Sequence, residues 1–191
     1  YVQKNIGARI TGITISERQY KYAKSLVYEN NKVLFMDYRK LNKTYDKIIS
    51  IEMFEAVGKR NWNKYFKILH ETLNKRGVAA LQIITIDEKV YSSYKDRGDF
   101  IQKYIFPGGM LPTKKHLNEL AKKNKLEILE KKSFRNDYAK TLSLWRGKFL
   151  KKWKDLEKMG FDDNFKRLWE FYLSYCEAGF KEGNIDVSQF I

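Results

Sequence analysis

The sequence is poor in the residues that form crosslinks and bind metals. Its 191 residues include one cysteine, Cys176, and two histidines. One cysteine excludes an internal disulfide and a cysteine-cluster metal site, so we expect no metal and a reducing, cytoplasmic compartment. No apolar run approaches the roughly 18 residues that a membrane-spanning helix needs. The opening YVQKNIGARI has the features of neither a signal peptide nor a transit peptide.

Proline and glycine-rich turns are scarce as well. Both prolines, Pro107 and Pro112, bracket a Gly-Gly pair in YIFPGGMLP (104–112), which predicts a rigid loop between elements. No low-complexity linker or internal repeat divides the chain, so we predict a single domain over residues 1–191. The first strand-like segment is not followed by the GxG turn at which α/β sheets bind nucleotide cofactors. Either the sheet binds no such cofactor, or the chain lacks the beginning of the fold.

Positive charge and apolar residues are abundant. Lys and Arg number 38 against 23 Asp and Glu, a formal net charge of +15 that favours an anionic partner. The basic residues include seven pairs, at 59–60, 75–76, 114–115, 122–123, 131–132, 151–152 and 166–167. They fit an anionic lipid surface or simply a lysine-rich solvated surface; because no aromatic residues interleave with them, we expect no nucleic-acid partner. A hydrophobic content of 43% excludes intrinsic disorder.

The order of apolar segments predicts the fold class. Strand-like runs alternate with amphipathic helices in the first 90 residues, which indicates βαβ units and an α/β doubly wound sheet. The second half predicts a helix, a strand and two long amphipathic helices. The expected strands are 8–14, 32–37, 46–52, 78–86 and 125–134, and the expected helices begin at Ser16 or cover 62–74, 113–123, 142–156 and 165–180.

Six segments, in order along the chain, carry a resemblance to a known family. They are GITISERQ (12–19), DYR (37–39), YDKIISIEMFEAVG (45–58), KYIFPGGMLP (103–112), DYAKTL (137–142) and FYLSYCEAGF (171–180). Together they resemble the cyclopropane-fatty-acyl-phospholipid synthases, an S-adenosylmethionine-dependent family that includes the mycolic acid cyclopropane synthases. The resemblance implies a Rossmann-like class I methyltransferase fold that lacks its first strand and glycine-rich turn. It also implies a helical segment that covers the acyl chain, at about 88–180.

The resemblance implies a reaction and a set of catalytic residues. A methylene group passes from S-adenosylmethionine to the cis double bond of an unsaturated phospholipid acyl chain and closes a cyclopropane ring. In the family, a bound bicarbonate takes the proton from the cationic intermediate. By motif alignment, Glu55, Tyr138, Gln82 and the backbone of Ile84 would hold this anion. Gln82 stands where the family has histidine, and an amide cannot change its protonation near neutral pH.

The resemblance also places residues at the cofactor. Thr14, Ile15 and Gln19 would line the adenosine of S-adenosylmethionine, and Tyr38 and Arg39 would close over the adenine.

Structural roles compete with several of these assignments. Gln19 fits a capping box with Ser16 at the start of a helix. Glu55 could cap a short turn, Gln82 could form a hydrogen bond across the sheet, and Tyr138 could belong to the core.

The sequence leaves three functions open. Lipid cyclopropanation is the leading hypothesis, with phospholipid acyl chains and an anionic membrane surface as partners and a peripheral location on the inner face of the membrane. A related methyltransferase without ring closure is the second, favoured by Gln82. A non-catalytic remnant that associates with membrane or nucleic acid is the third, favoured by the charge and the missing turn. Homodimer formation is an option that the sequence leaves open.

Overall fold

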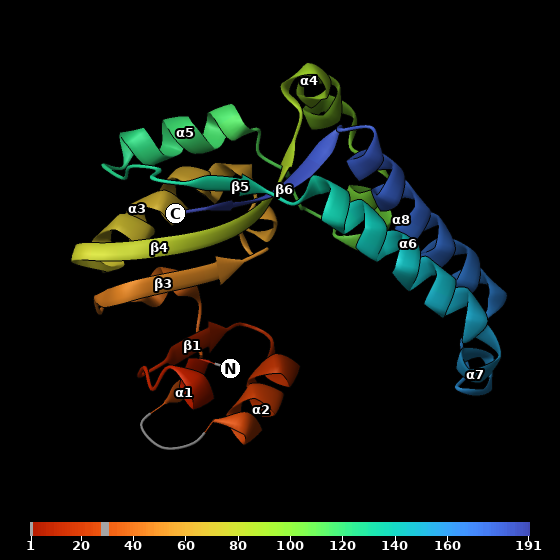
Figure 1. Cartoon of the computed structure of the whole chain (residues 1–191), viewed down its shortest axis with the longest axis horizontal. Coiled ribbons are helices and arrows are strands. Elements are labelled where there is room, and N and C mark those ends of the chain that lie inside the picture. The colour runs from red at the N-terminus through yellow and green to blue at the C-terminus, as the bar shows by residue number, and fades with distance from the viewer. Residues whose placement is uncertain (1, 28–30) are drawn as a thin grey trace. The chain divides into compact units, whose positions relative to one another are not determined.

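The computed structural model describes residues 2–27 and 31–191 of the chain. They fall into two compact units, Tyr1–Thr44 and Tyr45–Ile191, which are described separately below (Figure 1). The single domain predicted over 1–191 therefore stays a prediction.

The first unit is one βαβ motif with short additional helices. Its elements are α1 (Val2–Asn5), β1 (Thr11–Thr14), α2 (Glu17–Leu26), β2 (Lys32–Phe35) and the 3-10 turn η1 (Tyr38–Lys40). β1 and β2 pair in parallel, so both carboxyl ends lie at one edge, with Thr14 beside Phe35. Ser16 caps α2 by accepting the Gln19 N–H at 3.3 Å. The expected return bond from Gln19 to Ser16 is not formed, because the Gln19 side chain accepts the Thr14 hydroxyl at 2.8 Å instead.

The second unit contains a four-stranded sheet with helices packed on it (Figure 1). Its strands are β3 (Tyr45–Ile51), β4 (Leu73–Ile86), β5 (Lys131–Ser133) and β6 (Ile185–Phe190), in the order β3-β4-β6-β5. Its helices and turns are η2 (Phe54–Ala56), η3 (Lys59–Asn61), α3 (Trp62–Thr72), α4 (Glu88–Arg97), η4 (Ile101–Ile105), α5 (Lys114–Lys123), α6 (Arg135–Lys151), α7 (Trp153–Lys158) and α8 (Asp163–Lys181). β3 and β4 are parallel, whereas β6 is antiparallel to both of its neighbours.

Two of the strand predictions were wrong at the carboxyl side of the sheet. The strand expected over 125–134 is limited to β5 at Lys131–Ser133, and β6 was not predicted at all. β6 is short, and Asp186, Ser188 and Gln189 interrupt its apolar residues, so it lacks the apolar run that marks a buried strand. Its place between β4 and β5 nevertheless buries Val187 and Ser188 completely.

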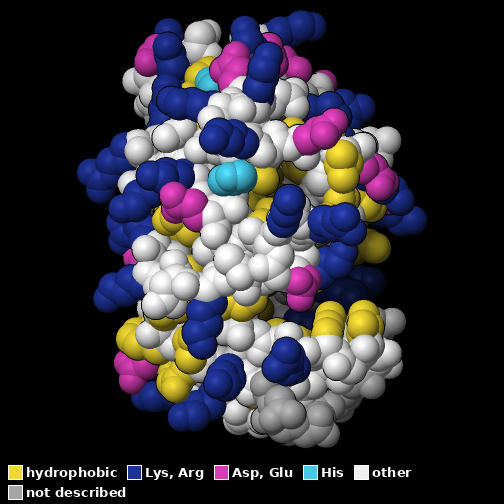
Figure 2. All heavy atoms as spheres, turned by 90° about the vertical axis from the view of Figure 1, so that its left-hand side faces the viewer, with side chains coloured by type: hydrophobic (Ala, Val, Ile, Leu, Met, Phe, Trp, Pro, Cys, Tyr) yellow, Lys and Arg dark blue, Asp and Glu magenta, His cyan; other side chains and the backbone are white. Residues whose placement is uncertain are grey.

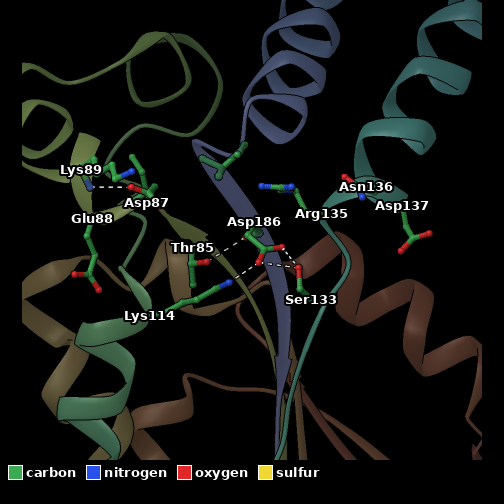
Figure 3. Close-up of a pocket in the computed structure, with 13 residues that line it drawn as sticks. Thr85, Asp87, Glu88, Lys89, Lys114, Ser133, Arg135, Asn136, Asp137 and Asp186 are labelled. Atoms are coloured by element: carbon green, nitrogen blue, oxygen red, sulfur yellow. Dashed lines mark hydrogen bonds and ion pairs between the residues drawn. The ribbon is translucent and has the colours of Figure 1, made fainter.

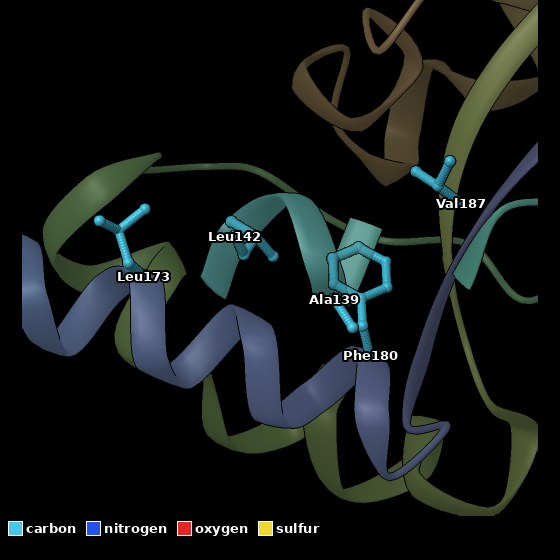
Figure 4. Close-up of a cluster of buried hydrophobic side chains, with 5 residues drawn as sticks. All are labelled: Ala139, Leu142, Leu173, Phe180 and Val187. Atoms are coloured by element: carbon cyan, nitrogen blue, oxygen red, sulfur yellow. The ribbon is translucent and has the colours of Figure 1, made fainter. Parts of the chain in front are cut away.

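Two groups of buried side chains hold the second unit together. Ala139 and Leu142 of α6 meet Leu173 and Phe180 of α8 above Val187 of β6 (Figure 4). On η2, the completely buried Phe54 packs among three aromatic rings of α3, at centroid distances of 5.0–5.6 Å. These contacts fix α6 and η2, the two elements from which the side chains of the candidate site project. Among the described residues, no helix is both long enough and apolar enough to cross a bilayer.

Truncating the α6–α8 contact should destabilise the chain. Leu173 is 2% exposed, so Leu173→Ala should lower the free energy of unfolding by about 2–5 kcal/mol through lost burial and the cavity left behind. Leu144 on α6 is 57% exposed, and Leu144→Ala should cost less than about 0.5 kcal/mol. Urea denaturation measures both. Equal losses in the two variants would contradict the packing described here.

Candidate functional site

Polar groups gather at the carboxyl ends of the parallel strands β3 and β4. Glu52 directly follows β3, Glu55 lies on η2, Gln82 and Ile84 belong to β4, and Tyr138 lies in the first turns of α6. We call these four side chains and the backbone N–H of Ile84 the carboxylate cluster. Ligand sites of α/β folds form at this edge of the sheet.

Glu52 is the centre of one half of the carboxylate cluster. Its Oε1 atom accepts hydrogen bonds from the Tyr138 hydroxyl and from Gln82 Nε2, the latter at 2.8 Å. Gln82 Nε2 also lies 2.8 Å from the Tyr138 oxygen, and Gln82 Oε1 accepts from Gln189 Nε2 of β6 at 3.0 Å. One carboxylate therefore ties β3, β4 and α6 together.

The backbone of Glu52 has an unusual conformation. Its φ is +51°, in the left-handed region that side-chain-bearing residues rarely adopt. The conformation costs roughly 1–2 kcal/mol relative to the right-handed region. It reverses the chain directly after β3, where the Glu52 N–H still donates to the Gln82 carbonyl at 2.8 Å. The reversal keeps the Glu52 carboxylate beside β4.

Glu55 forms the other half of the carboxylate cluster. Its Oε1 atom accepts the Ile84 N–H at 2.5 Å, while its Oε2 atom is buried and has no hydrogen-bond partner among the described residues. The buried ring of Phe54 anchors the preceding residue. The Glu55 carbonyl accepts the Met110 N–H at 2.9 Å, so the predicted YIFPGGMLP loop supports Glu55 from its other side.

Burial changes the acid–base properties of the carboxylate cluster. It raises the pKa of Glu55 to about 7, and the charge of Glu52 contributes in the same direction, while the bond from Ile84 opposes the shift. Burial also raises the pKa of Tyr138, as do its hydrogen bond to Glu52 and the charge of that residue. Near neutral pH, Glu55 can therefore gain or lose a proton, while Tyr138 is a hydrogen-bond donor.

The structure brings together all four groups that the resemblance assigned to bicarbonate. Glu55 contacts Ile84, and Gln82 contacts Tyr138. Glu52, which joins the second pair, was missed by sequence reasoning. The signal for it was present, because Glu52 ends the apolar run DKIISIE at the carboxyl end of a strand.

The hydrogen-bond donors of the carboxylate cluster do not fit a further anion. The Ile84 N–H is bound to Glu55, and the Tyr138 hydroxyl and the Gln82 amide are bound to Glu52. A bicarbonate ion would have to displace a carboxylate from each donor and would lie beside two acidic side chains. The bicarbonate assignment stays a prediction, and no step of the reaction proposed below is routed through this ion.

The residues assigned to adenosine belong to the first unit. Thr14 ends β1, and its hydroxyl accepts the Ser16 N–H at 3.1 Å while it donates to Gln19. Ile15 is 73% exposed, an apolar surface suited to stacking. Hydroxyl and amide groups at the end of a parallel strand are suited to the hydroxyls and ring nitrogens of a nucleoside.

The DYR segment follows β2 at the same edge of the first unit. Asp37 accepts from the Arg39 backbone at 2.8 Å and forms an ion pair with its guanidinium at 2.6 Å. This contact lowers the pKa of Asp37 to about 2. Burial raises the pKa of the half-buried Tyr38. The five residues thus form a polar edge whose chemistry fits S-adenosylmethionine, and their roles stay predictions.

A separate polar pocket of about 710 Å³ lies between the starts of α4, α5 and α6 and the start of β6. In it, Lys114 and Ser133 converge on Asp186, at 2.6 Å and 2.8 Å (Figure 3). These charges are mutually paired, and none of the nine predicted site residues lines the pocket. The network links α5, β5 and β6. Among the described residues, no three His, Cys, Asp or Glu side chains gather to hold a metal ion.

Comparison with known proteins identifies the family. The family model for mycolic acid cyclopropane synthetase matches residues 1–190. The chain belongs to this family. The family and the class I methyltransferase fold expected from the sequence are confirmed, the fold also by the crystal structure of mycolic acid cyclopropane synthase CmaA1 with SAH and CTAB. That structure has a TM-score of 0.88 at 28% identity, over 99% of this chain and 70% of the other.

Curated relatives are longer than this chain. Tuberculostearic acid methyltransferase UfaA1 of Mycobacterium tuberculosis is 38% identical over 96% of the chain and 44% of its own length. Cyclopropane-fatty-acyl-phospholipid synthase of Escherichia coli is 31% identical over 100% of the chain and 49% of its own length. The chain thus spans about half the length of these relatives.

The raised pKa of Glu55 should appear in the pH dependence of stability. A free glutamate titrates near 4.5, so between about pH 4.5 and 7 the unfolded chain releases a proton that the folded chain keeps. The contribution of Glu55 to stability is therefore complete below this window and is lost as the pH rises through it. Glu55→Gln keeps an acceptor for Ile84 and removes the titration. The wild type should lose stability relative to this variant between pH 5 and 7.5.

Urea denaturation at the two pH values measures this difference. Glu157→Gln on α7 is the control, because Glu157 is exposed and the same charge is removed. Its difference from the wild type should be the same at both pH values. A Glu55→Gln difference that is constant, or that changes in the opposite direction, would contradict a raised pKa.

Proposed function

We propose that the protein containing this chain transfers a methylene group from S-adenosylmethionine to the cis double bond of an unsaturated phospholipid acyl chain and closes a cyclopropane ring. When bound, S-adenosylmethionine supplies an electrophilic methyl group on a sulfonium. The observation that carries the proposal is the carboxylate cluster at the carboxyl edge of the sheet, in a chain of this family.

The carboxylate cluster suits a reaction that forms a carbocation. When the π electrons of an alkene attack a methyl group, the substrate gains a positive charge that must be stabilised and then lose a proton. Glu52 and Glu55 provide negative charge at one place, and burial strengthens such interactions by excluding water. Aromatic rings also stabilise cations, and the Tyr138 ring lies 5.4 Å from that of Phe180.

An aromatic surface of the second unit suits an acyl chain. The Phe100 ring lies 4.6 Å from Phe171, 5.5 Å from Tyr104 and 5.8 Å from Tyr175. Three of these four rings are at least 39% exposed. We call this set the aromatic patch. Tyr172, next to Phe171 on α8, is close enough to Glu52 for its charge to help burial raise the Tyr172 pKa to about 12. An acyl chain lying on the aromatic patch would therefore approach the carboxylate cluster.

One specific observation favours a second candidate function, methyl transfer to the same alkene without ring closure. Gln82 stands where the resemblance expects histidine, and the 38% identical relative is named a methyltransferase of tuberculostearic acid. The two functions share the methyl transfer and differ in which proton leaves the cation.

Product analysis tests both functions. The longest natural chain that contains these 191 residues should convert S-adenosylmethionine and vesicles of dioleoyl phosphatidylglycerol to S-adenosylhomocysteine and a modified lipid. Proton NMR of the fatty acid methyl esters should show upfield cyclopropane resonances. Vinyl methylene resonances instead would favour the second candidate. No S-adenosylhomocysteine above a lipid-free control would contradict both and favour a non-catalytic remnant.

We also propose that the protein associates peripherally with the cytoplasmic face of an anionic membrane. The basic pairs of the second unit are mostly exposed, and Lys and Arg side chains are spread over the face shown in Figure 2 without forming one cluster. Each basic residue near an anionic surface contributes about 1 kcal/mol to binding. Lys103 also lies over the Tyr104 ring at 5.1 Å, which places a cation within the aromatic patch.

Vesicle sedimentation tests the membrane proposal. Binding to phosphatidylglycerol vesicles should fall at least tenfold between about 50 and 500 mM salt, because exposed charges are screened within about 8 Å at physiological ionic strength and less far at higher salt. Phosphatidylcholine vesicles are the control and should bind little at either salt concentration. Binding that is independent of salt, or equal on both lipids, would contradict electrostatic docking.

A further inference from the structure

We propose that Glu52 is the group that accepts the proton from the substrate cation, in the place where the family resemblance expects bicarbonate. This inference rests on the proposed function. Glu52, like a bound bicarbonate, presents a carboxylate oxygen to the Tyr138 hydroxyl and to the Gln82 amide. The protein would then carry its base as a side chain and would need no dissolved anion.

The contacts of Glu52 distinguish it from a residue that only closes a turn. Its side chain is exposed, and both groups bound to its Oε1 atom come from elements distant in sequence, β4 and α6. A role in the turn alone would be met at lower cost by glycine, which adopts a φ of +51° readily. An unusual backbone conformation at a polar cluster is typical of functional sites.

The partner residue Gln82 fits the same role. A histidine at this position could hold an anion and also take up a proton, whereas the Gln82 amide can only donate and accept hydrogen bonds. Its Nε2 group is directed at Glu52, and its oxygen is held by Gln189, which fixes the orientation of the amide. Tyr138 and Gln82 therefore position the Glu52 carboxylate and leave the proton transfer to it.

The proposed step balances in atoms and electrons. The carbon–sulfur bond of S-adenosylmethionine breaks with its electron pair going to sulfur, and the alkene π pair forms the new carbon–carbon bond. A C–H bond of the transferred methyl then gives its proton to the Glu52 carboxylate, and its electron pair closes the ring. A proton next to a carbocation is strongly acidic, so an ordinary carboxylate accepts it and its position decides the rate. The protonated Glu52 afterwards releases the proton to water.

Removal of bicarbonate separates the two possible bases. On the longest natural chain containing these residues, wild-type turnover should differ less than twofold between carbonate-free buffer and about 50 mM bicarbonate. Glu52→Gln should lower turnover at least tenfold under both conditions, because it removes the proton acceptor. Glu157→Gln, the matched charge control on α7, should leave turnover unchanged.

A glycine variant tests the position directly. Glu52→Gly frees Tyr138 and Gln82 to hold an external anion and relieves the backbone conformation, so its melting temperature should not fall. Its turnover should be at least tenfold low in carbonate-free buffer and should rise several-fold with bicarbonate. Carbon-13 NMR of labelled bicarbonate should show line broadening with this variant and none with the wild type.

Several outcomes would overturn the inference. Wild-type turnover that requires bicarbonate, wild-type binding of labelled bicarbonate, or full activity of Glu52→Gln would each assign the base elsewhere while leaving the proposed function intact. Absence of any modified lipid from the wild type would overturn the proposed function and this inference with it.

Discussion

The parallel pairing of β3 with β4 is the constraint on which the carboxylate cluster depends. Because Ile51 lies opposite Gln82, the chain leaves β3 beside the residues of β4 that carry the site. The next two elements of order are the left-handed turn at Glu52 and the buried ring of Phe54. Together they direct one carboxylate toward Gln82 and a second toward the Ile84 backbone. A register shift of one residue would reverse the faces of β4 and separate these groups.

The two carboxylates of the cluster lie three residues apart yet differ in their surroundings. Glu55 is held between a buried aromatic group and the YIFPGGMLP loop, so its charged form is disfavoured. Glu52 is exposed and has two strong side-chain donors on one oxygen. Pairs of acids in unlike environments commonly divide the roles of acid and base in an active site. The arrangement supports a chemistry in which one group controls local charge and the other exchanges a proton.

The sheet of the second unit has one edge with apolar side chains exposed to solvent. β3 pairs only with β4 among the described residues, and its Ile49 and Ile51 are 64% and 63% exposed. The run DKIISIE nevertheless has the continuous apolar character of a strand covered on both faces. Unpaired parallel edges with exposed isoleucines favour association with other chains. This is consistent with a chain that spans about half the length of its relatives.

The sequence alone determined the family, the α/β class and most of the elements, because apolar periodicity and long motifs are local properties. It placed Glu55, Gln82, Ile84 and Tyr138 as candidates through their motifs. It did not predict β6, whose polar residues conceal a strand that neighbouring β4 and β5 bury, nor the exchange of Gln19 from the helix cap to Thr14. Only the tertiary structure showed that Glu52 occupies the donors of the site. That contact joins residues 56 and 86 positions away, Tyr138 from Gln82 and from Glu52, and such distances are decided by strand register and helix packing.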